Sequence, residues 1–144
     1  MINGVDHIVI LAPEIEAGVA VYAALLGRAP DWRAVSDTGV ATALFQLGNT
    51  ALELVAPSGH GSSAEHLRAR ITEEGPGLKS LAFRSTDIAG DHRAMSRLAL
   101  APTAVEEALS EDMAREARRT WRSFRVPPEH TAGIRWFFVA PEEG

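Results

Sequence analysis

The chain has 144 residues, 46% hydrophobic and 23% charged, and a formal net charge of −5; this is ordinary for a soluble globular protein and gives no electrostatic reason to expect nucleic acid or an anionic membrane as a partner. It contains no cysteine, which excludes disulfides, thiolate nucleophiles and cysteine-ligated zinc. No apolar run approaches the ~20 residues of a membrane helix and no secretion signal opens the chain, so we expect a single cytoplasmic domain.

The first half of the chain reads as a strand, a helix and three further strands. Residues 5–12 are a short, mostly apolar run of β type that contains His7. Residues 14–26 follow with apolar side chains on one helical face, which predicts a helix that covers a sheet. These apolar positions are Ile15, Val19, Tyr22 and Leu26. Strands are expected at 32–35, 41–47 and 51–55, the last two joined by a Gly48-Asn49 hairpin turn.

Residues 58–77 are interpreted as a connector between the two halves of the chain. Ser62 is followed three residues later by Glu65, a capping-box pattern that predicts a helix from Ser62 to Glu74. The Gly75-Pro76-Gly77 run then ends that helix.

The second half repeats the opening strand and helix at an offset of 73 residues, so that Ser80 corresponds to His7. A helix is expected from 88 to near Leu100, with His92 on its inner face as a packed, hydrogen-bonded histidine. Strands are expected at 121–126 and 134–139. Residues 103–119 stay open, because symmetry with the first half requires a strand there whereas Val105, Leu109 and Met113 recur at helical spacing.

The end of the repeat is also visible in the sequence. Leu54-Val55-Ala56-Pro57 returns as Phe138-Val139-Ala140-Pro141, which makes Phe137 the counterpart of Glu53. A chain that repeats one supersecondary unit is best read as two copies of that unit. We therefore predict one α+β domain made of two βαβββ modules, 1–57 and 78–144.

With the motifs Val5-Asp6-His7-Ile8 and Leu52-Glu53-Leu54, this arrangement resembles the glyoxalase-like domains of the vicinal oxygen chelate superfamily. That group includes glyoxalase I, bleomycin-resistance proteins, methylmalonyl-CoA epimerase and extradiol dioxygenases. The resemblance implies eight strands in a curved sheet around a cavity, a small-molecule ligand and a homodimer.

The resemblance also implies four positions for the ligands of a divalent metal ion, which are His7, Glu53, Ser80 and Phe137 here. The imidazole and the carboxylate are good ligands, the serine hydroxyl is a poor one, and the phenyl ring cannot coordinate. A large ring at a ligand position favours an apolar or aromatic guest instead. Glu53 either faces the cavity or is buried at a cost of several kcal/mol, and burial raises a carboxyl pKa in the way that suits a general base.

Further side chains are candidates for contact with a ligand. His130 lies in the turn before the last strand, where it either reaches over the cavity mouth as a substitute metal ligand or proton carrier, or is simply solvated. The full set of candidate ligand-binding residues is Ser80, Phe137, Phe45, Trp121 and His130.

Three functions are compatible with this sequence. The leading hypothesis is a small-molecule-binding protein with a degraded metal site, which sequesters an apolar or aromatic ligand or acts on it without metal through Glu53 and His7. The second is a divalent-metal-dependent lyase, isomerase or dioxygenase in which His7 and Glu53 bind the metal, helped by His130, substrate oxygens or water. The third is a non-catalytic module whose partner chain supplies the missing residues. The residue pattern identifies neither the ligand nor whether the protein is an enzyme.

Overall fold

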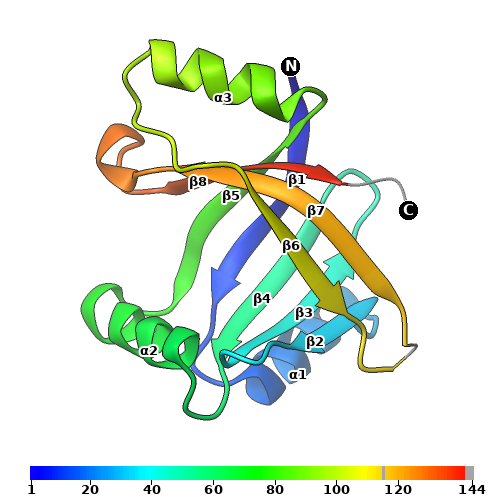
Figure 1. The fold of residues 1–144 in the computed structure, drawn as a ribbon. Coiled ribbons are helices and arrows are strands. Elements are labelled where there is room, and N and C mark those ends of the chain that lie inside the picture. Colours follow the sequence, from blue (N-terminus) through cyan, green and yellow to red (C-terminus); the bar gives the residue numbers. More distant parts are fainter. Residues whose placement is uncertain (115, 142–144) are drawn as a thin grey trace.

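The computed structural model describes residues 1–114 and 116–141 (Figure 1). Arg115 and residues 142–144, the end of the second predicted module, lie outside the described residues. The elements in chain order are β1 (Ile2–Leu11), α1 (Ile15–Leu26), β2 (Trp32–Val35), β3 (Val40–Gln46), β4 (Ala51–Pro57), α2 (Ser62–Glu74), β5 (Gly77–Ser85), α3 (Ile88–Arg97), β6 (Glu106–Glu111), β7 (Arg118–Val126), the 3₁₀ turn η1 (Pro128–His130) and β8 (Arg135–Pro141).

All the strands join one eight-stranded sheet in the order β2-β3-β4-β1-β5-β8-β7-β6. The two opening strands, β1 and β5, pair antiparallel in the middle of the sheet. Each of them also pairs in parallel with the last strand of its own unit, β1 with β4 and β5 with β8. The sheet curls until its edge strands approach, with the amide of Met113 donating to the carbonyl of Arg33 at 2.9 Å. The predicted α+β class and the eight-stranded curved sheet are confirmed.

The pairing registers repeat as the sequence offsets require. Glu53 pairs with the residue two positions after His7. Phe137 pairs with the residue two positions after Ser80. The two units therefore place these four residues at equivalent points of the sheet.

Helix α1 covers the convex face of the first unit. Its predicted apolar face packs on a buried cluster that includes Phe45, Leu52 and Leu54. Because side chains alternate along a strand, Glu53 between the two leucines faces the concave side. Gly27 ends the helix with φ 67°, a left-handed conformation that glycine adopts without a steric penalty.

Helix α3 covers the second unit in the same way. The rings of Phe124 and Phe138 stack beneath it with centroids 4.7 Å apart. His92 packs edge-on against Phe124 at 5.1 Å, and its Nε2 lies 2.9 Å from the carbonyl oxygen of Thr103. The prediction of a packed, hydrogen-bonded histidine is confirmed.

Helix α2 has the predicted bounds, Ser62–Glu74, but its N-terminus is capped differently from the sequence-based prediction. Its N-cap is Gly61, and no side chain caps the helix. Instead the carbonyl of Thr38 accepts hydrogen bonds from the amides of Ser63 and Ala64, both at 3.1 Å. The capping box assigned to Ser62 and Glu65 is therefore wrong, because a neighbouring loop supplies the acceptor that the serine side chain would have supplied.

The open segment 103–119 contains strand β6, paired antiparallel with β7. The helical spacing of its apolar residues has no structural counterpart, since Leu109 and Met113 are 52% and 66% exposed. Pairing with β7 decided this segment, as the symmetry between the two units requires.

Candidate functional site

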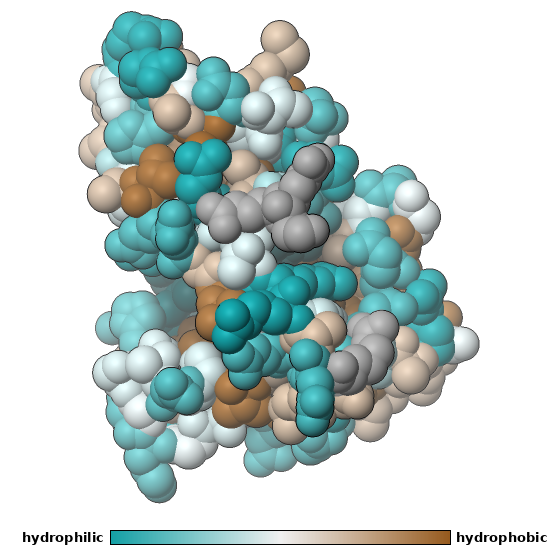
Figure 2. Space-filling model, turned by 45° about the vertical axis from the view of Figure 1, so that its right-hand side comes forward, coloured by the Kyte–Doolittle hydropathy of each residue, from teal (hydrophilic) through white to brown (hydrophobic). Residues whose placement is uncertain are grey.

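The concave side of the sheet encloses a cavity of about 1040 Å³ to which every strand contributes lining residues. Its floor carries polar groups of β1 and β4, and its opposite wall is made by β6 and β7. Hydrophilic side chains cover most of the face in Figure 2, with smaller hydrophobic patches exposed between them. A cavity of this size accommodates a small organic molecule, since ligand pockets measure about 300–1,000 Å³.

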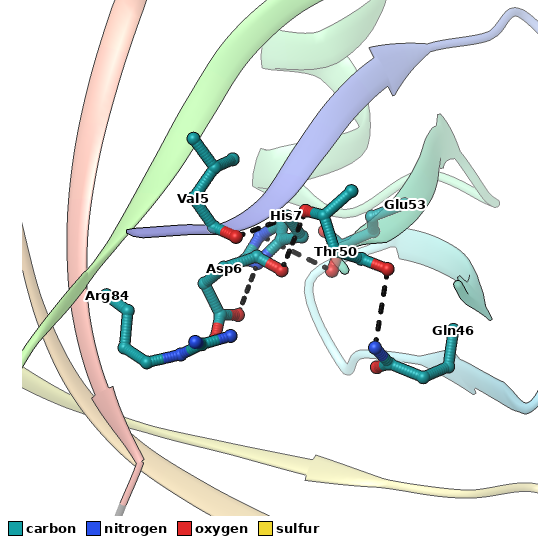
Figure 3. A network of polar contacts seen from close by, with 7 residues as sticks. All are labelled: Val5, Asp6, His7, Gln46, Thr50, Glu53 and Arg84. Atoms are coloured by element: carbon teal, nitrogen blue, oxygen red, sulfur yellow. Dashed lines mark hydrogen bonds and ion pairs between the residues drawn. The ribbon is translucent and has the colours of Figure 1, made fainter. Parts of the chain in front are cut away.

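An irregularity in β1 brings two neighbouring residues to the cavity. The ladder to β5 pairs Val5 with Phe83 and His7 with Ala82, which leaves Asp6 as an extra residue in a bulge. The hydroxyl of Thr50 donates to the carbonyls of Val5 and Asp6 at 3.2 and 3.3 Å (Figure 3). Strict alternation would send Asp6 to the other face, but both Asp6 and His7 line the cavity.

His7 lies between two carboxylates (Figure 3). Its Nδ1 is 2.9 Å from Oδ2 of Asp6, and since a carboxylate only accepts, the imidazole donates there. Its Nε2 is 3.8 Å from Oε2 of Glu53, which is an ion-pair distance but too long for a hydrogen bond. On its other oxygen, Asp6 meets Nε of Arg84 at 3.5 Å. Asp6 therefore fixes the ring and leaves Nε2 facing Glu53 and the cavity.

The electrostatics of this cluster shift the pKa values of Glu53, His7 and Asp6. Burial raises the pKa of Glu53, although the charges of His7 and, less strongly, Arg119 oppose the rise. Burial alone would lower the pKa of His7, but the hydrogen bond to Asp6 and the charge of Glu53 outweigh it, so the pKa is raised. The hydrogen bond from His7 lowers the pKa of Asp6 despite burial of the carboxyl. A carboxylate of increased basicity thus faces an imidazole that holds its proton more tightly.

The predicted site residues separate into two groups. His7, Glu53 and Trp121 line the cavity together. Among the described residues that line it, Ser80 and Phe137 do not appear, although alternation with Arg84 and Val139 puts them on the concave face. Ser80 is 3% exposed. The second unit therefore contributes to the cavity through positions nearer the ends of its strands.

Two predicted ligand-binding residues lie elsewhere. Phe45 is fully buried in the cluster beneath α1, so its assignment to the cavity wall is wrong. The reason is strand parity, because Leu44 faces the cavity and its neighbour must face the helix. His130 is an exposed residue of η1 outside the set of described lining residues.

Arginines at the cavity were missed by the sequence analysis. Arg84, Arg118 and Arg119 all line it. For Arg119 a signal existed, since it lies two positions before Trp121 and therefore shares its face of the strand. The pattern was hidden because the predicted strand began at residue 121, whereas β7 begins at Arg118.

The side chains at the four implied metal-ligand positions do not form a complete divalent-metal site. Among the described residues, no group of three or more histidine and acidic side chains is arranged to hold a metal ion. His7 and Glu53 are suitable donors, but their counterparts are the buried Ser80 and a phenyl ring. Asp6 is engaged with Nδ1 of His7 and with Arg84, which leaves it on the far side of the imidazole. Two donors alone make a weak site for a hard cation.

Paired βαβββ units around a cavity define a protein of the vicinal oxygen chelate superfamily. The glyoxalase-like domain model matches residues 5–143, and the chain belongs to that family. A search of curated proteins gave no match.

Solved structures with the same fold include two methylmalonyl-CoA epimerases. One, from Streptomyces coelicolor, is a variant in complex with 2-nitronate-propionyl-CoA; it is 18% identical, has a TM-score of 0.76, and the match covers 97% of this chain and 95% of that one. Another, from Mycobacterium tuberculosis, is 20% identical with a TM-score of 0.71, and the match covers 99% and 90% of the respective chains. A hypothetical protein of Bacillus halodurans C-125 is 19% identical with a TM-score of 0.72, over 97% and 95% of the chains. At these identities the likeness shows the fold.

No helix in the described part of the chain combines the length and the hydropathy needed to cross a membrane.

Proposed function

We propose that this protein binds a small organic ligand in the cavity and transfers protons on it with Glu53 and His7, without a metal ion. One observation carries the proposal: Nε2 of His7 and Oε2 of Glu53 face each other at 3.8 Å at the cavity, with Asp6 holding the opposite edge of the imidazole. An acid and a base of this kind typically accelerate proton transfer about 10²–10⁴-fold.

The chemistry suits a carbon acid next to a carbonyl group. The carboxylate of Glu53 takes a proton from the carbon next to the carbonyl group. The electron pair of the broken C–H bond forms a C=C bond, and the π electrons of the C=O bond move to the oxygen. Protonated His7 gives its Nε2 proton to that oxygen, so a neutral enol forms. Return of both protons restores the carbonyl compound, and a proton that has exchanged with solvent in the meantime is carried into the product. The raised pKa values of both groups favour these roles.

The rest of the cavity indicates the kind of ligand. Trp32 and Trp121 provide aromatic surface on its walls, which agrees with an apolar or aromatic body. Structural neighbours include methylmalonyl-CoA epimerases in complex with 2-nitronate-propionyl-CoA and with methylmalonyl-CoA, which supports a small-molecule ligand in this fold.

Hydrogen exchange tests the proposed chemistry. Phenylpyruvate, a carbonyl compound with an aromatic ring and acidic C–H bonds, serves as the probe, and deuterium incorporation at its C3 is followed by proton NMR in D₂O with excess EDTA. We expect exchange faster than in buffer, reduced by about 10²-fold or more in Glu53→Gln and in His7→Asn. Exchange at the buffer rate in the unmodified protein, or equal exchange in Glu53→Gln, would contradict the proposal.

A metal-dependent lyase, isomerase or dioxygenase is the second candidate. It is favoured by the carboxylate on Nδ1 of His7, because a metal-binding histidine generally donates its other ring N–H to such a group. In this case Nε2 of His7 and the carboxylate of Glu53 would hold the ion, which would act as a Lewis acid. Native mass spectrometry of protein purified without chelator decides: one tightly held divalent ion per chain, lost in Glu53→Gln, supports this candidate against the first.

The homodimer implied by the family resemblance stays a prediction. Light scattering at several protein concentrations checks it, and a monomer at every concentration would refute it.

A further inference from the structure

The arginines of the cavity differ in whether their charge is already matched. Arg84 lies 3.5 Å from Asp6, and Arg118 lies 3.3 Å from Glu111. Arg119 has neither an ion pair nor a hydrogen-bond acceptor for its guanidinium among the residues that the structure describes. It is therefore the cation at the cavity that remains available for a ligand.

The position of Arg119 is set by an aromatic side chain rather than by an acid. Its guanidinium carbon lies 4.3 Å from the ring centroid of Trp32. The indole is 6% exposed, and its Nε1 donates to Oγ of Ser110 at 2.9 Å. Ser110 is also directly opposite Arg119 in the β6–β7 ladder. The indole of Trp32, which belongs to β2, is thus held in place beneath the guanidinium by its hydrogen bond to Ser110 of β6.

Stacking leaves the hydrogen-bonding edge of a guanidinium free. The guanidinium carbon of Arg119 lies over the indole, and a guanidinium that stacks flat on an aromatic ring keeps its in-plane N–H donors free for another partner. A planar donor fork of this kind matches a carboxylate, which it binds through two parallel hydrogen bonds. The stacked face also reduces the conformational freedom that the side chain would otherwise lose on binding.

The remaining cavity residues limit what such an anion is attached to. Trp121 shares the cavity-facing side of β7 with Arg119 and adds apolar wall area. Glu53 and Asp6 also line the cavity, and their carboxylates disfavour a second anionic group beside them. An acid with one anionic end and an apolar or carbonyl-containing body fits this distribution.

We propose that Arg119, stacked on Trp32, binds the carboxylate of an aromatic or apolar organic acid and directs the rest of the molecule toward Glu53 and His7. The inference rests on the proposed function in that it assigns a substrate class, monocarboxylic acids, to the same cavity. Arg119 is a binding residue that selects the anionic form of the ligand. Arg118, its neighbour, is matched by Glu111 and takes no part in this contact.

Calorimetric titration with two probes of equal shape tests the assignment. Phenylacetate carries the carboxylate, and phenylacetamide replaces it with a neutral amide. We expect the wild-type protein to bind phenylacetate roughly tenfold more tightly than phenylacetamide or better, the range of a charge-assisted hydrogen bond. Arg119→Gln removes this preference, and Arg119→Lys keeps part of it, because an ammonium retains the charge but not the planar fork.

Arg118→Gln is the matched control, since it removes the same charge from the adjacent residue. It is expected to change the affinity for phenylacetate less than twofold. Near-ultraviolet circular dichroism of each variant checks that the tryptophan environment is kept, and Arg119→Lys provides the second variant if Arg119→Gln unfolds. The inference is overturned if Arg118→Gln and Arg119→Gln lose equal affinity for phenylacetate, or if the wild type binds the two probes equally. It is also overturned if the wild type does not bind phenylacetate at 10 mM, roughly the weak limit for a ligand of this size.

The experiment separates this inference from the proposed chemistry. Glu53→Gln is expected to bind phenylacetate while losing the exchange activity on phenylpyruvate. Carboxylate-selective binding without exchange in the wild type would refute the chemistry and leave the anchor in place. Exchange on phenylpyruvate in the wild type, together with a preference for phenylacetate that persists in Arg119→Gln, would refute the anchor and leave the chemistry.

Discussion

Replacing Glu53 with glutamine probes the central feature of the cavity, the interaction between its carboxylate and His7. The two groups are 3.8 Å apart, with the imidazole 18% and the carboxylate 26% exposed. At this separation Coulomb's law gives an attraction of about 1 kcal/mol in water and about 4 kcal/mol at the effective dielectric constant of ~20 near a protein surface. Partial access of solvent favours the lower part of this range.

Because the attraction acts only on the protonated imidazole, its removal must lower the pKa of His7. Burial, which opposes protonation of this ring, remains in Glu53→Gln, while the charge that countered it is gone. The titration is followed by NMR through the ring protons of His7, assigned by comparison with His7→Asn. In Glu53→Gln the hydrogen bond between Nδ1 of His7 and Asp6 remains and holds the imidazole ring in place.

The expected result is a downward displacement of the His7 titration in Glu53→Gln and a further one in the double variant with Asp6→Asn. Leu54→Met, a change of shape on the other face of β4, is the control and should leave the titration in place. An unchanged or raised pKa of His7 in Glu53→Gln would show that the two side chains do not interact in solution. It would also contradict the proposal that Glu53 and His7 act together as base and acid.

Three further results are expected. Leu54→Ala, at a fully buried position under α1, should cost about 2–5 kcal/mol of unfolding free energy by urea denaturation; a loss below ~1 kcal/mol would mean that α1 does not cover this strand. The lowered pKa of Asp6 contributes stability that is present above the ordinary carboxyl pKa of 3.8 and is lost as the pH falls through the pKa of the folded state. Asp6→Asn should therefore flatten the acid limb of a plot of urea midpoint against pH. An unaltered acid limb would contradict the lowered pKa of Asp6. Gly61→Ala should destabilise the protein by about 1–3 kcal/mol in thermal unfolding, because its Cβ would lie 2.1 Å from the carbonyl oxygen of Thr38, and a neutral effect would show that α2 begins elsewhere.

Much of the fold was predictable because its signals are periodic. The apolar face of α1 was visible at helical spacing, and the buried positions of β4 follow from alternation on either side of Glu53. The internal repeat then related His7 to Ser80 and Glu53 to Phe137, and the pairing registers agree. These predictions depend on local periodicity and on duplication, both of which are properties of the residue order.

Local sequence signals were overridden where a distant segment supplied the deciding contact. Ser62 had the pattern of a capping residue, but the carbonyl of Thr38 occupies that role. The segment around Leu109 had helical spacing, but a free edge of β7 was available for pairing. Local propensity is a weak preference that such tertiary contacts override.

The residue order alone separated Glu53 from its flanking leucines through strand alternation and matched the two units through the offset of the repeat. The resemblance to glyoxalase-like domains added the expectation that His7 and Glu53 face the cavity. Only the tertiary structure revealed Asp6 on the cavity, since a bulge appears when two strands are aligned and one has an extra residue. It also revealed the contact of Arg119 with Trp32, whose indole is held by a serine 78 positions away. That contact exists because the sheet curls until β6 approaches β2, and curvature is a property of the whole sheet that no single stretch of the chain encodes.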